Sequence, residues 1–195
     1  FNDSSFSSGL IGVGTGRSSK AISFEPLLLN GQEIDLLNQF NMINAYSPLP
    51  VIGDWAYESV DGDQKIKATS GNKPLSAIHN TTISDGILKT QIGFKQNLTT
   101  DYNEALIYFR TTDDYTSGYA LGVNTDGRVQ FYKISNGYSG LIAIGSAVSL
   151  NNFDLASMHD VQITLNGTSM SVSIDGSANI VSVNDSTYAS DNNIH

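Results

Sequence analysis

The chain has 195 residues, no cysteine and a formal net charge of −9, from 10 Lys and Arg against 19 Asp and Glu. The length allows one well-buried core, and the acidic balance excludes nucleic-acid binders and proteins that dock on anionic lipid, because both need a basic patch. Without cysteine there is no disulfide framework and no thiolate-based site. No apolar run approaches the roughly 20 residues that span a bilayer, and Phe1 does not open a signal peptide, so we expect a soluble segment, mature or excised.

The first residues of the chain resemble the last ones. Asn2–Ser8 (NDSSFSS) and Asn184–Ser190 (NDSTYAS) have like residue types at every position, at an offset of 182. This likeness predicts one period of a tandem repeat plus a short overlap; the alternative is coincidence in a chain rich in Ser and Asn. If the repeat is real, residues 1–29 hold the terminal strands of a preceding repeat.

Residues 30–48 are predicted to form a linker with a short helix. Ile34, Leu37 and Phe40 would share one stripe of a helix over Glu33–Ile43. The same segment contains Glu33-x-Asp35-x-x-Asn38, which is close to the Glu-x-Asp-x-x-Glu strand of some glycoside hydrolases. Because Asn38 cannot donate a proton as a carboxylic acid does, we expect no catalysis, and a glycosidase is the lesser alternative.

From Gly86 onward, short strand-like runs follow one another about every ten residues. Asn-Gly and Asp-Gly dipeptides punctuate them, which is typical of tight hairpin turns. Val161, Ile163 and Leu165 alternate with polar residues, whereas Ala105–Phe109 is apolar on both faces and suits a central strand. The pattern predicts an all-β, two-sheet antiparallel sandwich. The expected strands are Gly86–Lys95, Glu104–Thr111, Gly118–Asn124, Arg128–Ser135, Leu141–Ser149, His159–Asn166, Ser169–Asp175 and Asn179–Asn184.

The module at residues 49–195 lacks its last strands in this interpretation, which would leave an open core and an unpaired edge. Leu10–Leu29 carries the missing sequence. We therefore expect the N-terminal strands to complete the C-terminal module, either by folding back within the chain or by donation to the next chain.

Several runs, in order, resemble laminin-G-like, concanavalin A-like jelly rolls. They are Val51–Trp55, Gly86–Phe94, Ala105–Arg110, Gly118–Val123, Arg128–Lys133, His159–Thr164 and Ser171–Gly176, with Gly9–Thr15 and Ala21–Phe24 resembling the last two strands of such a domain. The resemblance implies a jelly roll used for carbohydrate or cell-surface recognition, often with a structural calcium ion. It does not identify a ligand.

Groups suited to binding sugars concentrate between two of the expected strands. Arg110, Asp113, Asp114, Tyr115 and Tyr119 lie there, and aromatic faces with carboxylate or guanidinium groups are what sugar rings and hydroxyls require. Tyr138, from a neighbouring hairpin, completes this predicted carbohydrate site. The alternative is that Arg110 pairs with Asp113 or Asp114 while the tyrosines cover the sandwich edge.

One structural calcium ion is the cofactor expected, with Asp185 and Glu25 as ligands, since the resemblance brings the Phe24–Glu25 strand close to the start of the chain. Calcium needs six to eight oxygens, and a solvated acidic surface is the alternative.

The leading hypothesis is a non-enzymatic, extracellular or surface-displayed repeat module for adhesion, whose partners are a glycan or cell-surface polysaccharide and neighbouring copies of the repeat. The alternative is a structural subunit of a filament, sheath or virus particle appendage, assembled by strand complementation. High Ser, Thr and Asn content (25, 14 and 18 residues) with few lysines favours the cell or virion surface.

Overall fold

The computed structural model describes residues 9–16, 22–24, 27–34, 55–60, 63–68, 75–94, 104–112, 117–135 and 140–188. Within these ranges no helix is long and apolar enough to cross a membrane. The described residues form fifteen strands. In chain order they are β1 (Gly9–Gly16), β2 (Ile22–Phe24), β3 (Leu27–Leu29), β4 (Gln32–Ile34), β5 (Trp55–Val60), β6 (Asp63–Ala68), β7 (Leu75–Ile83), β8 (Gly86–Phe94), β9 (Glu104–Thr111), β10 (Ser117–Asn124), β11 (Arg128–Ser135), β12 (Leu141–Ser149), β13 (Met158–Asn166), β14 (Ser169–Ile174) and β15 (Ser177–Asn184).

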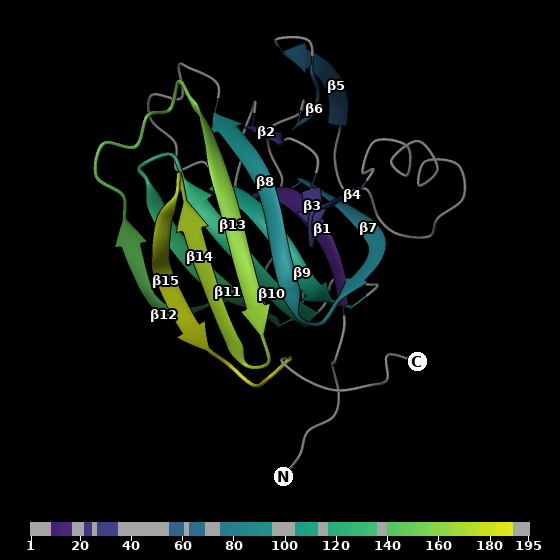
Figure 1. The fold of residues 1–195 in the computed structure, drawn as a ribbon, viewed down its shortest axis with the longest axis vertical. Coiled ribbons are helices and arrows are strands. Elements are labelled where there is room, and N and C mark those ends of the chain that lie inside the picture. Colours follow the sequence, from purple (N-terminus) through teal and green to yellow (C-terminus); the bar gives the residue numbers. More distant parts are fainter. Residues whose placement is uncertain are drawn as a thin grey trace.

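The strands form two antiparallel sheets that pack face to face (Figure 1). The six-stranded sheet has the order β12-β11-β10-β9-β1-β7. The nine-stranded sheet follows β15-β14-β13-β8-β2-β6-β5, with β3 beside β8 and β4 beside β3. In Figure 1 the strands β8, β13, β14 and β15 lie in front of β9, β10 and β11. The predicted all-β, two-sheet antiparallel sandwich is therefore confirmed.

The core lies between the sheets and follows the period-two alternation of the strands. On β13, Val161, Ile163 and Leu165 are buried, whereas Gln162 and Thr164 are half-buried on the outer face. Burying a side chain of this size fully contributes about 1.5–3 kcal/mol. A register slip by one residue would turn the apolar side chains to water, so burial fixes the pairing of β13 with β8 and β14.

Strand β9 lies in the middle of the six-stranded sheet, between β10 and β1. Ile107 and Phe109 face the core between the sheets, while Leu106 and Tyr108 belong to a second buried cluster. The prediction that Ala105–Phe109 is a central strand, apolar on both faces, is confirmed.

Two predicted turns adopt the backbone that Asn-Gly and Asp-Gly pairs favour. Asn30 and Gly31 have φ of 51° and 81° between β3 and β4, and Asp175 and Gly176 have φ of 50° and 74° between β14 and β15. Asn30 also docks this hairpin on β8, because its N–H donates to the Ile87 carbonyl and its Oδ1 accepts from the Ile87 N–H.

The N-terminal strands complete both sheets of the sandwich. Strand β1 pairs with β7 on one side and β9 on the other, and β2 pairs with β8 and β6. The expectation that the N-terminal strands complete the C-terminal module is confirmed, and in this structure they do so within their own chain. The division at residues 1–29, 30–48 and 49–195 stays a prediction.

The prediction of a helix that starts at Glu33 is wrong for its first two residues, because Gln32–Ile34 forms strand β4 beside β3. Backbone pairing with β3 satisfies this short piece, so it does not need the hydrogen bonds of a helix. Glu33 is exposed on that strand. Asp35 and Asn38, the other members of the glycosidase-like motif, lie outside the described residues.

Candidate functional site

Arg110, predicted to bind carbohydrate, is completely buried at the end of β9. Its Nε donates to the Ser84 carbonyl at 2.8 Å, Nη1 to the Gly167 carbonyl at 2.9 Å and Nη2 to Asp85 Oδ1 at 3.0 Å. The guanidinium thus joins the β7–β8 turn to the β13–β14 turn. The prediction of a glycan contact is wrong for Arg110, because its donors face protein partners.

Among the described residues, the carboxylate partner of Arg110 is Asp85; Asp113 and Asp114, which the alternative interpretation named, lie outside them. Burial lowers the pKa of Arg110, and the Asp85 carboxylate opposes that shift. Arginine stays charged in proteins, so this is a buried cation held by one carboxylate and two carbonyls.

Tyr119 on β10 is likewise buried. Its hydroxyl donates to Asp185 Oδ1 at 2.8 Å and accepts from the Tyr188 N–H at 2.8 Å, while its ring stacks on Phe109. Burial raises the pKa of Tyr119 above its usual value. The prediction that Tyr119 contacts a glycan is wrong, because its ring belongs to the core and its hydroxyl anchors the segment after β15.

Asp185, predicted as a calcium ligand, is already engaged by protein groups. Oδ1 accepts from the Tyr119 hydroxyl and the Thr187 N–H, and Oδ2 lies 3.5 Å from the Lys133 ammonium. Burial acts to raise the pKa of Asp185, but the hydrogen bonds from Thr187 and Tyr119 and the Lys133 charge outweigh it, so the pKa lies below its ordinary value.

The Asp185 carboxylate does not fit a calcium ligand set, because an ammonium already supplies its positive partner. Among the described residues, no group of three His, Asp or Glu side chains gathers as a metal site would require. Glu25, the second predicted ligand, lies outside the described residues.

Four further residues of the predicted carbohydrate site, Asp113, Asp114, Tyr115 and Tyr138, lie outside the described residues, and their role stays a prediction. The structure describes the base of the first loop. There the Thr112 N–H donates to the Ser117 carbonyl at 3.0 Å, and the Ser117 N–H donates to Thr112 Oγ1 at 3.2 Å.

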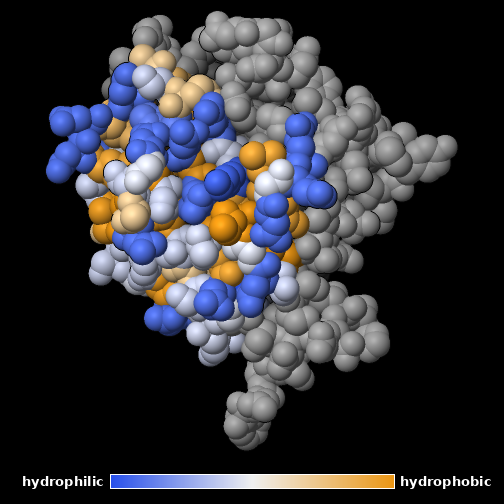
Figure 2. Space-filling view, in the orientation of Figure 1, coloured by the Kyte–Doolittle hydropathy of each residue, from blue (hydrophilic) through white to orange (hydrophobic). Residues whose placement is uncertain are grey.

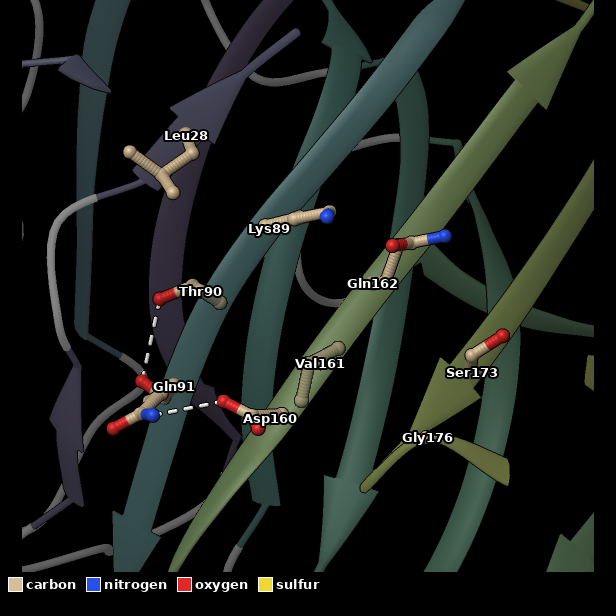
Figure 3. A pocket seen from close by; sticks show the side chains of 9 residues that line it. All are labelled: Leu28, Lys89, Thr90, Gln91, Asp160, Val161, Gln162, Ser173 and Gly176. Atoms are coloured by element: carbon tan, nitrogen blue, oxygen red, sulfur yellow. Dashed lines mark hydrogen bonds between the residues drawn. The ribbon is translucent and has the colours of Figure 1, made fainter. Parts of the chain in front are cut away.

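A hollow of about 400 Å³ lies on the outer face of the nine-stranded sheet. We call it the sheet-face groove (Figure 3). Its lining residues are Leu28, Lys89, Thr90, Gln91, Asp160, Val161, Gln162, Ser173 and Gly176. This volume lies within the range of about 300–1,000 Å³ typical of small-ligand sites.

The strand register arranges the groove side chains in rows across the sheet. Leu28 on β3 lies opposite Lys89 on β8, Lys89 opposite Gln162 on β13, and Gln162 opposite Ser173 on β14. One row therefore carries an ammonium, an amide and a hydroxyl in sequence across three strands, with Leu28 as an apolar end. Neighbouring strands lie about 4.8 Å apart, so these groups are spaced to contact one bound molecule.

The next row pairs Gln91 with Asp160. Gln91 Nε2 donates to Asp160 Oδ1 at 2.8 Å, as the dashed line in Figure 3 shows. The amide holds one carboxylate oxygen and leaves the other facing outward. The row is built on two paired strands, so its geometry is set by the fold rather than by a loop.

The β14–β15 turn forms one edge of the groove through Gly176. Asp175 fixes this turn, because its Oδ1 accepts from the Asp160 N–H at 2.9 Å and its Oδ2 lies 2.7 Å from His159 Nδ1. His159 Nε2 in turn contacts the Asp154 carbonyl at 2.7 Å, and its ring stacks on Phe153. Hydrogen bonds through His159 thus connect this edge of the groove to the segment between β12 and β13.

Two groove side chains have no partner of their own. Within the described part of the chain, Lys89 and Gln162 make no side-chain hydrogen bond or ion pair. Ser173 Oγ accepts from the Asn179 N–H at 3.3 Å, which leaves its hydroxyl proton available. Figure 2 shows strongly hydrophilic residues on this face, interspersed with pale and apolar ones.

Sequence reasoning missed this groove. The signal was present in the polar residues that alternate with buried ones, Lys89 and Gln91 on β8 and Gln162 on β13. Such alternation is also the normal appearance of a solvent-facing sheet surface. It indicated which side chains face water, but not that the face is hollow.

No protein-family model matches the sequence, and no curated protein matches it. A solved structure that the chain resembles is the carbohydrate-binding module CBM66 from Bacillus subtilis, at 16% sequence identity and a TM-score of 0.49, over 71% of this chain and 80% of that one.

Proposed function

We propose that the protein is a non-catalytic recognition module that binds carbohydrate in the sheet-face groove. The observation that supports this most is the set of polar groups in the groove that the fold leaves open, above all Gln162, Lys89 and the hydroxyl proton of Ser173. Sugar hydroxyls both donate and accept, and an amide, a carboxylate and a hydroxyl offer both functions.

The polarity of the groove supports carbohydrate over other small ligands. Sites for drug-like molecules are lined mostly by apolar and aromatic side chains, whereas six of the nine groove residues are polar or charged. Each hydrogen bond to a neutral hydroxyl contributes about 0.5–1.5 kcal/mol net. The strands hold the backbone of these residues in place before binding, so the ordering cost is limited to side chains such as Lys89 and Gln162.

A glycan array followed by calorimetry on the best ligand tests this function. We expect Gln162→Ala and Ser173→Ala to weaken binding, each by about five- to tenfold. Ser171→Ala and Thr164→Ala are matched controls, because Ser171 and Thr164 face the same way one row outside the groove. Unchanged binding in both groove variants, or equal loss in the controls, would contradict the proposal.

In this proposal the module is displayed outside the cell, or on a virion, as one unit of a tandem-repeat protein for adhesion. The low charge density and the likeness between Asn2–Ser8 and Asn184–Ser190 support this setting. Protease treatment of intact cells or particles that make the protein tests it, since a displayed module is cleaved without lysis and an internal one is protected.

The second candidate function is assembly of chains by strand complementation, and it needs a test of its own. It is favoured by the position of β1, which lies between two strands, β7 and β9, that come much later in the chain. Val13 lies opposite Ile107 in this pairing. In a chain without natural cysteine, a Val13→Cys, Ile107→Cys double variant reports the partner directly. A disulfide within one chain keeps the monomer mass, whereas disulfides between successive chains of a filament give a ladder of multiples of the monomer mass on a non-reducing gel.

A further inference from the structure

Lys89 differs from two other cations that the structure describes. Arg110 and Lys133 each face a carboxylate, Asp85 and Asp185 respectively. Lys89 lies exposed on β8 between Leu28 and Gln162, and across the described ranges it has no ion pair. Arg128 on β11 is likewise exposed and has no ion pair among the described residues, so what distinguishes Lys89 is its place in the groove.

The carboxylate of the groove itself does not neutralise Lys89. Asp160 lies opposite Gln91, in the next row along the strands, and the Gln91 amide holds its Oδ1. The direct cross-strand neighbours of Lys89 are an alkyl side chain and an amide. Neither neighbour supplies a counter-charge to the exposed ammonium.

The groove also has no aromatic side chain among its nine lining residues. Stacking on a sugar ring, which contributes much of the affinity in many carbohydrate sites, is therefore not offered by these residues. Charge-assisted hydrogen bonds are roughly twice as strong as neutral ones. Lys89 and Asp160 are the two charged groups that the groove offers, and Lys89 is the one that attracts an anionic group.

We propose that the sheet-face groove selects an acidic sugar unit, with Lys89 binding its carboxylate or sulfate and Gln162 and Ser173 binding hydroxyls along the same row. This inference rests on the proposed function. The expected glycan class is a sugar ring with several hydroxyls and one anionic substituent, either a carboxylate or a sulfate. Asp160 and Gln91, in the adjacent row, contact hydroxyls and disfavour a second anion at that position.

The test uses the full chain and two matched pairs of polymers: polygalacturonate with its methyl ester, and dextran sulfate with dextran. We expect the anionic member of at least one pair to bind more tightly than the neutral member, and the pair that does so identifies carboxylate or sulfate. Lys89→Gln should weaken that binding by about tenfold or more. Raising salt from about 0.1 M to about 1 M should weaken it too, because the screening length falls from about 10 Å to about 3 Å.

Arg128→Gln is the matched control, since it removes one exposed positive charge on β11, outside the groove. Unchanged binding in Arg128→Gln with loss in Lys89→Gln supports a specific contact, whereas equal loss in both overturns it in favour of general charge attraction. If Gln162→Ala weakens binding and Lys89→Gln does not, the acidic-sugar inference fails and the carbohydrate function stands. If neither changes binding, the proposed function itself fails.

Discussion

The buried polar groups around Arg110 and Tyr119, which we call the sandwich rim, and the outer face of the nine-stranded sheet carry the same kinds of polar side chain but use them in opposite ways. At the rim, Arg110 and Tyr119 are buried and their polar atoms bind protein groups. On the outer face, Lys89 and Gln162 have no protein partner in the described structure. The difference teaches that residue type does not mark a binding site; what marks it is whether the fold has already used the polar atoms.

The largest effect is expected at Arg110, the most deeply buried charge of the rim. Arg110→Met removes the partner of Asp85 and leaves the Ser84 and Gly167 carbonyls without their donor. Because the Asp85 side chain is 57% exposed, the loss comes mainly from the two carbonyls, each of which costs about 1–3 kcal/mol when it loses its donor, and we expect that loss in the free energy of unfolding. Urea titration followed by circular dichroism measures it.

Two variants control the Arg110 experiment. Arg128→Met removes an exposed arginine and should change stability by less than about 0.5 kcal/mol. Arg110→Lys keeps the charge but cannot reproduce three bonds in a planar fork, so it should lie between the two. An Arg110→Met protein as stable as Arg128→Met would mean that the rim does not depend on this cation, and the comparison of the two regions would break.

The next effect is expected at Tyr119. Tyr119→Phe keeps the ring against Phe109 but removes the hydroxyl between Asp185 and the Tyr188 N–H. Leaving a buried donor unsatisfied costs about 1–3 kcal/mol. Combined with Asp185→Ala, which removes the acceptor, in a double-mutant cycle, the loss should be less than additive, because both changes remove the same bond. Additive losses would show that the Tyr119 hydroxyl stabilises the fold by another route.

A smaller effect, visible in the pH dependence, is expected at Asp185. Its pKa lies below the ordinary value of 3.8, because the hydrogen bonds from Thr187 and Tyr119 and the Lys133 charge outweigh the effect of burial. A carboxylate with a lowered pKa stabilises the folded state above its unfolded pKa, and this contribution is lost as pH falls through the folded pKa. The stability gap between wild type and Asp185→Asn should therefore be full at neutral pH and close below about pH 4. A gap that stays constant to pH 2 would contradict the assignment.

Local sequence patterns predicted most of the strands but not what the side chains do. The runs Glu104–Thr111, Arg128–Ser135 and Leu141–Ser149 were predicted with the bounds that the structure has. Strand β6 was missed, because Asp63–Ala68 has little apolar alternation and pairs near one end of its sheet. The short β4 was taken for the start of a helix, because a three-residue strand is specified by its partner β3 and not by its own period.

The site was harder to predict than the fold because its determinants are far apart in the sequence. Arg110 looked available for a ligand; its partners Ser84 and Gly167 come from two distant turns. The groove exists only because β3 docks beside β8 and the Asp175–Gly176 turn rises at the other side. Neither the hydrogen bonds of Arg110 nor the hollow on the outer face of the nine-stranded sheet can be predicted from residues that are close in the sequence.

The smallest effect on stability is expected in the groove, and it decides whether the two regions truly differ. Gln162→Ala and Lys89→Gln remove side chains without protein partners, so each should change the free energy of unfolding by less than about 0.5 kcal/mol. Gln91→Ala should cost slightly more, because Gln91 holds Asp160. Urea titration of these three variants in parallel with Arg110→Met compares their free energies of unfolding directly. A loss above about 1 kcal/mol for Gln162→Ala would mean that the groove residues hold the sheet together as the rim residues do, and polar groups left open by the fold would no longer point to a ligand.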